Sequence, residues 1–256
     1  MRLSISSTNV QEWSGDVLVV GLPKGDPSTT AVNLESRFPG VSSALNQQAF
    51  EGKTGQKLVL HPLTNGNPLR LVLVGLGDAD AIDLDGLRAA AAAGAQASIG
   101  CNGSLGLQLP WDSQDSDQAA RISAEAVRLS LYADQRFQKE PEERRLPTAL
   151  ELIGLPASAA AGLEPVNATC AGVELARELV AAPPNYVTPA ALADTAAALA
   201  RDYGMELTIL ERADCAARGM GAFLSVSQGS DLPPKFIHLI YRPEGAVKRR
   251  LALVGK

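Results

Sequence analysis

The run Arg70–Gly77 (RLVLVGLG) is the segment that most constrains the fold. A strand with one face in water alternates apolar and polar residues, whereas this run is apolar after its first residue. Such a strand must be covered on both faces, which is typical of a parallel sheet with helices on either side. Asp16–Leu22 (DVLVVGL) has the same character. We therefore predict an α/β fold.

Helical patterns separate the candidate strands, as an α/β fold requires. Asp83 or Asp85 is placed to cap a helix through the Ala-rich stretch that ends at Ala97. Ser116–Phe137 has the spacing of a long helix, with core contacts at Ile122, Val127, Leu131 and Phe137. Further predicted helices are Val166–Ala182, Pro189–Tyr203 and Glu211–Arg218, and further predicted strands are Lys57–Leu63, Ser104–Leu109, Thr148–Leu155, Met205–Leu210, Lys235–Tyr241 and Leu251–Val254.

The composition changes at Pro156–Pro165, which is rich in Ala, Ser, Gly and Pro. We place a domain boundary there and predict a first domain at 1–165, a bridging helix at 166–185 and the start of a second domain at 186–256. The last strand is followed only by Gly255 and Lys256. In open α/β sheets, chemistry lies beyond the carboxyl ends of central strands. We therefore expect the chain to be the first part of a larger enzyme, without the second part of its active site.

The charge balance disfavours several classes of partner. Lys and Arg number 23 and Asp and Glu number 28, which gives a formal net charge of −5. A mildly acidic chain has no general attraction for nucleic acid or anionic lipid. We expect neither a membrane nor a nucleic acid as partner.

The cysteines and the amino-terminus indicate a reducing compartment. Cys101, Cys170 and Cys215 are odd in number and form no C-x-x-C pair, which disfavours a disulfide framework or structural zinc. The start MRLSISSTNVQEW lacks the apolar stretch of a signal peptide, and no run of roughly 18 apolar residues could span a membrane. We expect a soluble cytoplasmic protein.

Nucleophilic catalysis is disfavoured by the scarcity of histidine. Cys215 has only His61 and His238 as candidate bases, and His238 lies within an apolar strand, where we expect a packed core residue. Ser225 and Ser227 lie in an apolar segment that we interpret as a strand, without a G-x-S-x-G elbow. We interpret all of these residues as structural.

Two glycine patterns resemble phosphate-binding motifs but are incomplete. Gly75 and Gly77 follow a strand, yet the third glycine of a dinucleotide fingerprint would fall at Asp80. The pair Gly255-Lys256 would need a glycine at Arg250 to end a P-loop. We interpret the first pattern as a tight strand-to-helix turn and reject the second.

Three blocks in the last third of the chain resemble the leucyl aminopeptidase family, also called the cytosol aminopeptidases. Glu178–Pro189 (ELVAAPPNYVTP) resembles the junction that opens the family's catalytic domain. Met220–Pro243 (MGAFLSVSQGSDLPPKFIHLIYRP) is similar to the family's Gly-Met-Gly turn, apolar strand, Gln-Gly-Ser loop and strand ending in Tyr-x-Pro. The final LALVGK resembles the strand that carries the family's first metal-binding lysine.

The resemblance implies a macro-domain-like amino-terminal α/β domain, a bridging helix and the beginning of an α/β catalytic domain. It implies that Lys256 is a metal ligand, since it occupies the position of the family's lysine after Val-Gly. The family's other ligands lie in a Thr-Phe-Asp-Ser-Gly-Gly block and an Asn-Thr-Asp-Ala-Glu-Gly-Arg block, and neither occurs in this sequence. No catalytic residue is therefore assigned within the chain, and its substrate-binding residues stay unknown.

The implied enzyme uses two divalent ions, manganese or zinc, to hydrolyse amino-terminal residues from peptides. Two metals lower the pKa of a water that lies between them and also hold the substrate's amino group. A lysine becomes a ligand only as a neutral amine, which requires the metal's charge to overcome its usual pKa of about 10.4. One lysine alone binds such an ion negligibly, so we expect no bound metal and no peptidase activity in these 256 residues. The resemblance further implies a homo-hexamer once the catalytic domain is complete.

A binding module is the alternative function. The amino-terminal region resembles macro domains, some of which bind ADP-ribose, and some bacterial relatives bind DNA. The acidic balance and the lack of a clustered Lys/Arg stripe disfavour DNA. If neither ligand binds, we expect this domain to serve as a scaffold for assembly.

Overall fold

The computed structural model describes residues 1–25, 31–62, 68–112 and 114–255 of the chain. The chain divides into two compact units, Met1–Glu178 (unit 1) and Leu179–Lys256 (unit 2). The boundary falls in the last turn of a long helix, α6 (Val166–Ala181). None of the described helices combines the length and the hydropathy that a membrane span requires.

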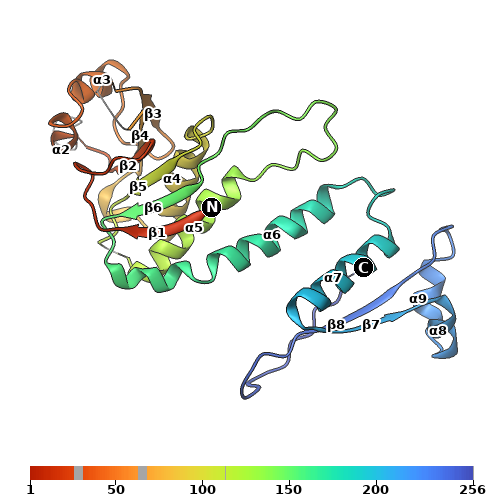
Figure 1. Cartoon of the computed structure of the whole chain (residues 1–256). Coiled ribbons are helices and arrows are strands. Elements are labelled where there is room, and N and C mark those ends of the chain that lie inside the picture. The colour runs from red at the N-terminus through yellow and green to blue at the C-terminus, as the bar shows by residue number, and fades with distance from the viewer. Residues whose placement is uncertain (26–30, 63–67, 113, 256) are drawn as a thin grey trace. The chain divides into compact units, whose positions relative to one another are not determined.

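Unit 1 is built on a six-stranded sheet with the order β1-β6-β5-β2-β4-β3 (Figure 1). Every neighbouring pair is parallel except β3 and β4, which are antiparallel at one edge. This mixed but mainly parallel sheet confirms the predicted α/β class. The strands are β1 (Arg2–Ser6), β2 (Val17–Leu22), β3 (Lys57–Leu60), β4 (Arg70–Gly75), β5 (Ser104–Gln108) and β6 (Ala149–Ile153).

The central strand β2 is buried along its whole length, as its continuous apolar sequence predicts. Successive side chains of a strand point to opposite faces, so Val17 and Val19 join one core and Leu18 and Val20 join another. The first core is completed by α4, α5, the 3₁₀ segment η2 and α6, and the second by α2 and α3. The covering elements before α6 are α2 (Val32–Glu35), α3 (Val41–Gln47), α4 (Leu84–Ala97), α5 (Ser116–Leu131) and η2 (Ala157–Leu163). A further 3₁₀ segment, η1 (Ala79–Ala81), has no buried residue.

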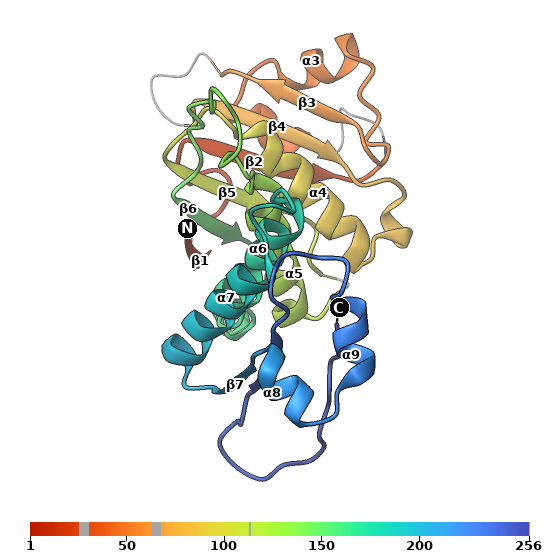
Figure 2. The same ribbon diagram turned by 90° about the vertical axis from the view of Figure 1, so that its right-hand side faces the viewer.

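Carboxylate caps set the starts of the two long helices that cover the first core. Asp83 accepts a hydrogen bond from the backbone N–H of Gly86 at 2.8 Å, which confirms one of the two predicted caps of α4. Asp115 does the same for the N–H of Gln118 at 2.9 Å at the start of α5. The two helices pack against each other beside the sheet (Figure 2).

Helix α5 ends at Leu131, so the prediction of a helix to Phe137 was wrong. Phe137 is 46% exposed rather than part of the core. The apolar spacing stops at Leu131, and the carboxylate of Asp134 instead accepts hydrogen bonds from the backbone and the guanidinium of Arg136. Such local bonds compete with the helical ladder and favour a turn.

Unit 2 is a two-stranded antiparallel sheet with three helices. Helix α7 begins as predicted, because Thr188 accepts a hydrogen bond from the N–H of Ala191 at 3.2 Å and Pro189 takes the first helical position. It ends at Gly204, whose φ of 64° lies in the left-handed region. The elements are α7 (Pro189–Tyr203), β7 (Glu206–Leu210), α8 (Arg212–Ala217), α9 (Gly221–Val226) and β8 (Phe236–Ile240).

Three expectations for unit 2 were wrong. The segment that contains Ser225 and Ser227 is the helix α9 and its last turn, not a strand. His238 is exposed on β8 rather than packed in a core. Leu251–Val254 is irregular, since a strand needs a partner to receive its backbone hydrogen bonds and none lies beside this run among the described residues.

Candidate functional site

The predicted metal ligand, Lys256, lies outside the described residues. The residues before it are described, and Leu251–Gly255 is an exposed, irregular segment. The role of Lys256 as a metal ligand therefore stays a prediction. The domain limits at residues 165 and 185 also stay predictions.

The block Glu178–Pro189 forms the end of α6 and a tight turn before α7. The carbonyl of Pro183 accepts hydrogen bonds from the N–H groups of Tyr186 and Val187, at 2.8 and 3.0 Å. Two consecutive prolines stop α6, because a proline cannot donate to the helical ladder. This turn fixes where α7 starts and contributes no titratable side chain that is buried.

The described part of the chain does not by itself supply a metal site. It contains no group of three or more His, Cys, Asp or Glu side chains that could hold an ion. Divalent ions of the zinc or manganese type need several carboxylate, imidazole or thiolate ligands. The described residues therefore do not fit a two-metal centre, and no catalytic step is assigned to them.

The hydroxyls of two candidate nucleophiles are hydrogen-bonded within their own segment. The hydroxyls of Ser225 and Ser227 donate to the carbonyls of Ala222 and Leu224, both at 2.8 Å, within the α9 segment. Cys215 is buried in α8. Cys101, Cys170 and Cys215 are free thiols.

Two ion pairs lie at the ends of the two strands of unit 2. The guanidinium of Arg242 pairs with the carboxylate of Glu206, and the ammonium of Lys235 pairs with Glu211. The hydrogen bond from Arg242 lowers the pKa of Glu206 below its usual value, and the same bond raises the pKa of Arg242. Both partners are exposed, so water screens the interaction and the pair contributes little to the stability of unit 2.

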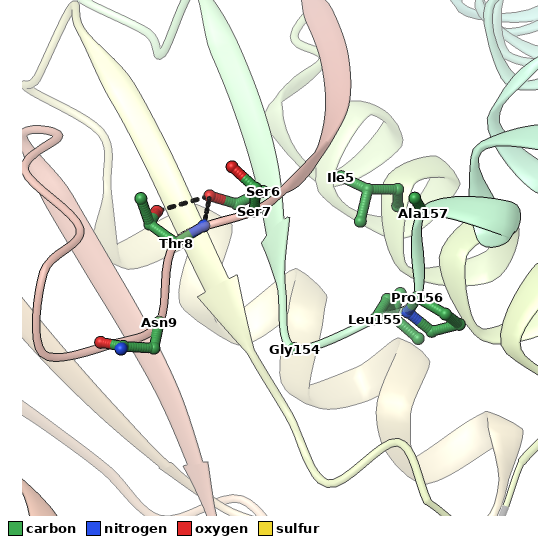
Figure 3. Close-up of a pocket in the computed structure, with 9 residues that line it drawn as sticks. All are labelled: Ile5, Ser6, Ser7, Thr8, Asn9, Gly154, Leu155, Pro156 and Ala157. Carbon is green, nitrogen blue, oxygen red and sulfur yellow. Dashed lines mark hydrogen bonds between the residues drawn. The ribbon is translucent and has the colours of Figure 1, made fainter.

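Unit 1 has an open cavity of about 560 Å³ at the carboxyl ends of β1 and β6 (Figure 3). It is lined by the segment that follows each of these parallel strands, 5–9 and 154–157. The hydroxyls of Ser6 and Thr8 are hydrogen-bonded to each other at 2.8 Å. The nine lining residues carry no titratable side chain, so the cavity offers no acid, and no base that could activate the hydroxyls of Ser6, Ser7 and Thr8.

The strand order reverses between β2 and β5, where open α/β sheets place their ligands. Apolar side chains fill this position: Leu22, Leu76, Leu109 and Trp111 are all less than 10% exposed. The indole N–H of Trp111 donates to the carbonyl of Ile153 at 2.8 Å, which holds the ring in place. The described residues thus give no support to the alternative of a macro-domain-like ligand site.

The sequence analysis missed the strand that lines this cavity. In β1 the apolar residues Leu3 and Ile5 alternate with Arg2, Ser4 and Ser6, which is the pattern of a half-exposed strand. The strand is an edge strand with a single neighbour, so it lacks the continuous apolar run by which β2 and β4 are recognised.

Family comparisons cover both units. Residues 19–141 match the sequence model of the cytosol aminopeptidase family, N-terminal domain. Residues 174–256 match the model of the cytosol aminopeptidase family, catalytic domain.

Individual relatives agree with these matches. A probable cytosol aminopeptidase of Synechococcus sp. (strain CC9902) is 94% identical over all 256 residues, which correspond to 52% of that protein. A mutant of tomato leucine aminopeptidase has a TM-score of 0.85 and 29% identity, covering 97% of this chain and 52% of the tomato chain. The bottromycin maturation enzyme BotP, solved in complex with Mn, has a TM-score of 0.68 and 29% identity, covering 90% of this chain and 46% of its own.

The mainly parallel α/β sheet of unit 1 and the elements of unit 2 together have the fold of the matching part of leucine aminopeptidase. The chain belongs to the cytosol aminopeptidase family, an enzyme family. It spans about half the length of the curated relatives that it matches.

Proposed function

We propose that this chain is the amino-terminal half of a leucyl-type metalloaminopeptidase that removes amino-terminal residues from peptides. The observation that carries the proposal is the succession of two matches within one chain. The family's N-terminal domain is matched at 19–141, and its catalytic domain is matched from residue 174 onward. The relatives continue for about as many residues again, which supports a catalytic domain that is completed by a second half.

Lys256 is the one residue of the chain that we propose as a metal ligand of the complete enzyme. Its support is its position after Leu251–Gly255, the run that resembles the family's lysine-bearing strand. The ions are manganese or zinc, and the Mn complex of BotP supports the first. When bound, two such ions activate a water for attack on a peptide bond.

The remaining predictions follow from the same family membership. We propose an amino-terminal domain at 1–165, a bridging helix at 166–185 and the first part of the catalytic domain at 186–256. The complete enzyme is proposed to form a cytoplasmic homo-hexamer. Size measurement of the complete enzyme by light scattering tests the assembly.

A continuous fusion tests the function. Residues 1–256 are joined to the remaining residues of the relative from Synechococcus sp. (strain CC9902), and hydrolysis of a leucyl chromogenic substrate is measured with Mn²⁺ or Zn²⁺ added. The fusion is expected to be active, and the chain alone is expected to be inactive. Metal-dependent release of leucine by the chain alone, or an inactive but folded fusion, contradicts the proposal.

Two lysine substitutions in the fusion test whether Lys256 is a metal ligand. Lys256→Met removes the amine and is expected to lower metal affinity by at least about 10- to 100-fold, since losing a residue that only orients a ligand already costs that much. Lys248→Met, at an exposed lysine eight positions earlier, is the matched control and retains full metal content. Metal stoichiometry by mass spectrometry separates the two, and equal metal content in both variants rules out Lys256 as a ligand.

A further inference from the structure

An open groove follows the free edge of β1 in unit 1. Ile5 and Ala157, which lie side by side in Figure 3, line both the cavity of about 560 Å³ and a second open cavity of about 550 Å³ that continues along β1 to Leu3. β1 lines one side of the second cavity, and η2 and the beginning of α6 line the other. We call the two cavities together the edge groove. Every residue that lines it belongs to unit 1.

The backbone of β1 directs hydrogen-bonding groups away from its sheet, toward this groove. The N–H of Arg2 donates to the carbonyl of Thr148 at 2.9 Å, where the pairing with β6 begins. Successive residues of a strand direct their N–H and C=O groups to opposite edges, so Leu3 and Ile5 direct theirs to the other edge. In the described part of the chain, β6 is the one strand beside β1. An extended polypeptide can therefore pair with the main-chain groups of Leu3 and Ile5.

The walls of the edge groove suit alternate apolar side chains. The side chains of Leu3 and Ile5 are half-buried against the first core, and Ala157 and Ala160 present only methyl groups from η2. Such small side chains leave room for those of an added strand, of which every second one points the same way. The strand that fits therefore has apolar residues at alternate positions.

One end of the edge groove carries a carboxylate. Of the residues that line the two cavities, Glu164 alone is charged. It lines the cavity that reaches Leu3, is exposed, and has no ion-pair partner among the described residues. The other end, at 6–9, offers only hydroxyls and an amide. A single carboxylate in an otherwise neutral groove favours a cationic side chain at that end of the bound segment.

A second copy of the chain does not fit the groove in the same way. An antiparallel, two-fold pairing of β1 with itself would bring η2 of both copies to the same side of one seam, because η2 packs beside β1. Neighbouring strands lie about 4.8 Å apart, whereas packed helices need about 8–10 Å. A single extended segment brings no such helix, so it is the occupant that the groove admits.

We propose that the edge groove binds a linear segment of another protein by strand addition to β1. The segment is extended and antiparallel to β1, since antiparallel pairs are slightly more stable per residue than parallel ones. It has apolar side chains at alternate positions and a lysine or arginine beside Glu164, at the amino end of β1. The inference goes beyond the proposed peptidase activity and does not require it.

The probe is a fluorescent peptide, Thr-Val-Thr-Val-Thr-Lys, with both ends blocked so that an aminopeptidase cannot shorten it. Fluorescence anisotropy is measured with the 256-residue chain and with the fusion described above. Saturable binding to both proteins is expected, with slower hydrogen exchange of the Leu3 and Ile5 amides by NMR in the chain. Absence of binding, or unchanged exchange at these amides, overturns the proposal. Binding to the chain but not to the fusion also overturns it, because the groove is then covered in the complete enzyme.

Backbone methylation of the probe tests strand addition. Directly opposite residues of an antiparallel pair share a face and, at alternate positions, exchange both hydrogen bonds. The valines, which lie opposite Leu3 and Ile5, therefore direct their N–H groups toward β1. N-methylation of both valines is expected to weaken binding by about 10-fold or more, and N-methylation of two threonines leaves it unchanged. Equal effects of the two modifications rule out strand addition.

Two adjacent residues of η2 locate the groove. Ala160→Arg places a long cationic side chain in it and is expected to weaken binding by about 10-fold or more. Ala161→Arg, at an equally exposed position that lines neither cavity, is the matched control and keeps the affinity of the unmodified chain. Equal affinities of the two variants overturn the assignment of the groove.

The charge of the segment is tested at Glu164. Glu164→Gln is expected to weaken binding of the lysine probe by about 2- to 5-fold, the scale of an exposed ion pair. A probe with norleucine in place of lysine should bind both proteins equally. A loss that is the same for the two probes excludes an ion pair between Glu164 and the segment.

Discussion

Arg128 on α5 holds Glu174 on α6 through two parallel hydrogen bonds, 2.8 Å from Nε to Oε1 and 2.7 Å from Nη2 to Oε2. A third donor of the same guanidinium, Nη1, reaches the side-chain oxygen of Asn167 at 2.9 Å. The bond to Glu174 raises the pKa of Arg128. Arg128 belongs to the segment matched by the family's N-terminal domain and Glu174 to the segment matched by its catalytic domain. This pair therefore holds the middle of α6 against α5 within unit 1.

Arg128→Met is expected to lower the free energy of unfolding of unit 1 by about 1–3 kcal/mol, because it leaves the carboxylate of a half-buried pair without its partner. The two tryptophans, Trp13 and Trp111, are both buried in unit 1, so urea unfolding followed by tryptophan fluorescence reports this unit alone. Arg121→Met, which removes a more exposed pair with Glu125 on the same helix, is the control and costs about 0.5 kcal/mol or less. Equal losses in both variants contradict the prediction.

Asp134 makes the stability of unit 1 depend on pH under acidic conditions. Hydrogen bonds from Arg136 lower the pKa of Asp134 from 3.8 to about 2. Because the folded-state pKa lies below the unfolded one, this stabilisation is fully present above about pH 4 and is lost as the pH falls toward 2. A carboxyl NMR titration should give a midpoint near pH 2, and Arg136→Gln should return it toward 3.8. A midpoint that Arg136→Gln leaves in place excludes the guanidinium as the cause.

Gly162 allows η2 to approach α5 closely. A Cβ at this position would lie 2.1 Å from the carbonyl oxygen of Asp117, which is backbone and cannot rotate away. Gly162→Ala is expected to destabilise unit 1 by about 1–3 kcal/mol through overpacking. Gly172→Ala, in the exposed middle of α6 with no atom within 4 Å of the new Cβ, should stabilise by about 0.5–1 kcal/mol. Urea unfolding should show that the free energy of unfolding falls in the first variant and rises in the second. A change of the same sign in both variants contradicts the role of Gly162 in this close approach.

Unit 2 should exchange its backbone hydrogens much faster than unit 1 in the isolated chain. β7 and β8 have no fully buried residue, whereas β2 and β4 lie in the middle of a six-stranded sheet between two cores. Exchange from a segment with few buried contacts requires only a local opening, while exchange from the core requires global unfolding. Mass spectrometry of peptides that cover 206–210 and 17–22 provides the comparison. Equal protection of these two peptides would contradict the expectation that few buried contacts make β7 and β8 open locally.

The sequence predicted the elements whose signals are local. β2, β4, α4 and α7 follow from continuous apolar runs, Ala-rich periodicity and the cap residues Asp83 and Thr188. The resemblance of the last third to the cytosol aminopeptidases was confirmed by the family match at 174–256. Both kinds of signal need no knowledge of which segments meet in space.

The elements that depend on a distant partner were missed or misassigned. β1 is a strand because β6 lies beside it, and its own sequence is only weakly apolar. Leu251–Val254 has a strong strand sequence but no neighbour among the described residues, so it is irregular. The helix α9 was misassigned because a short, largely apolar run of six residues fits either a strand or a helix. Lys256 lies outside the described residues and stays a prediction.

The pairing of β1 with β6 has a consequence during synthesis on the ribosome. Arg2 is aligned with Ala149, so the strand of this sheet that is synthesised first must wait for the one that is synthesised last. At typical elongation rates this delay is roughly ten seconds or longer, during which the edge of β1 has no neighbour. The polar residues Ser4 and Ser6 make this waiting segment less prone to aggregate than an apolar strand such as β2 would be at the same position.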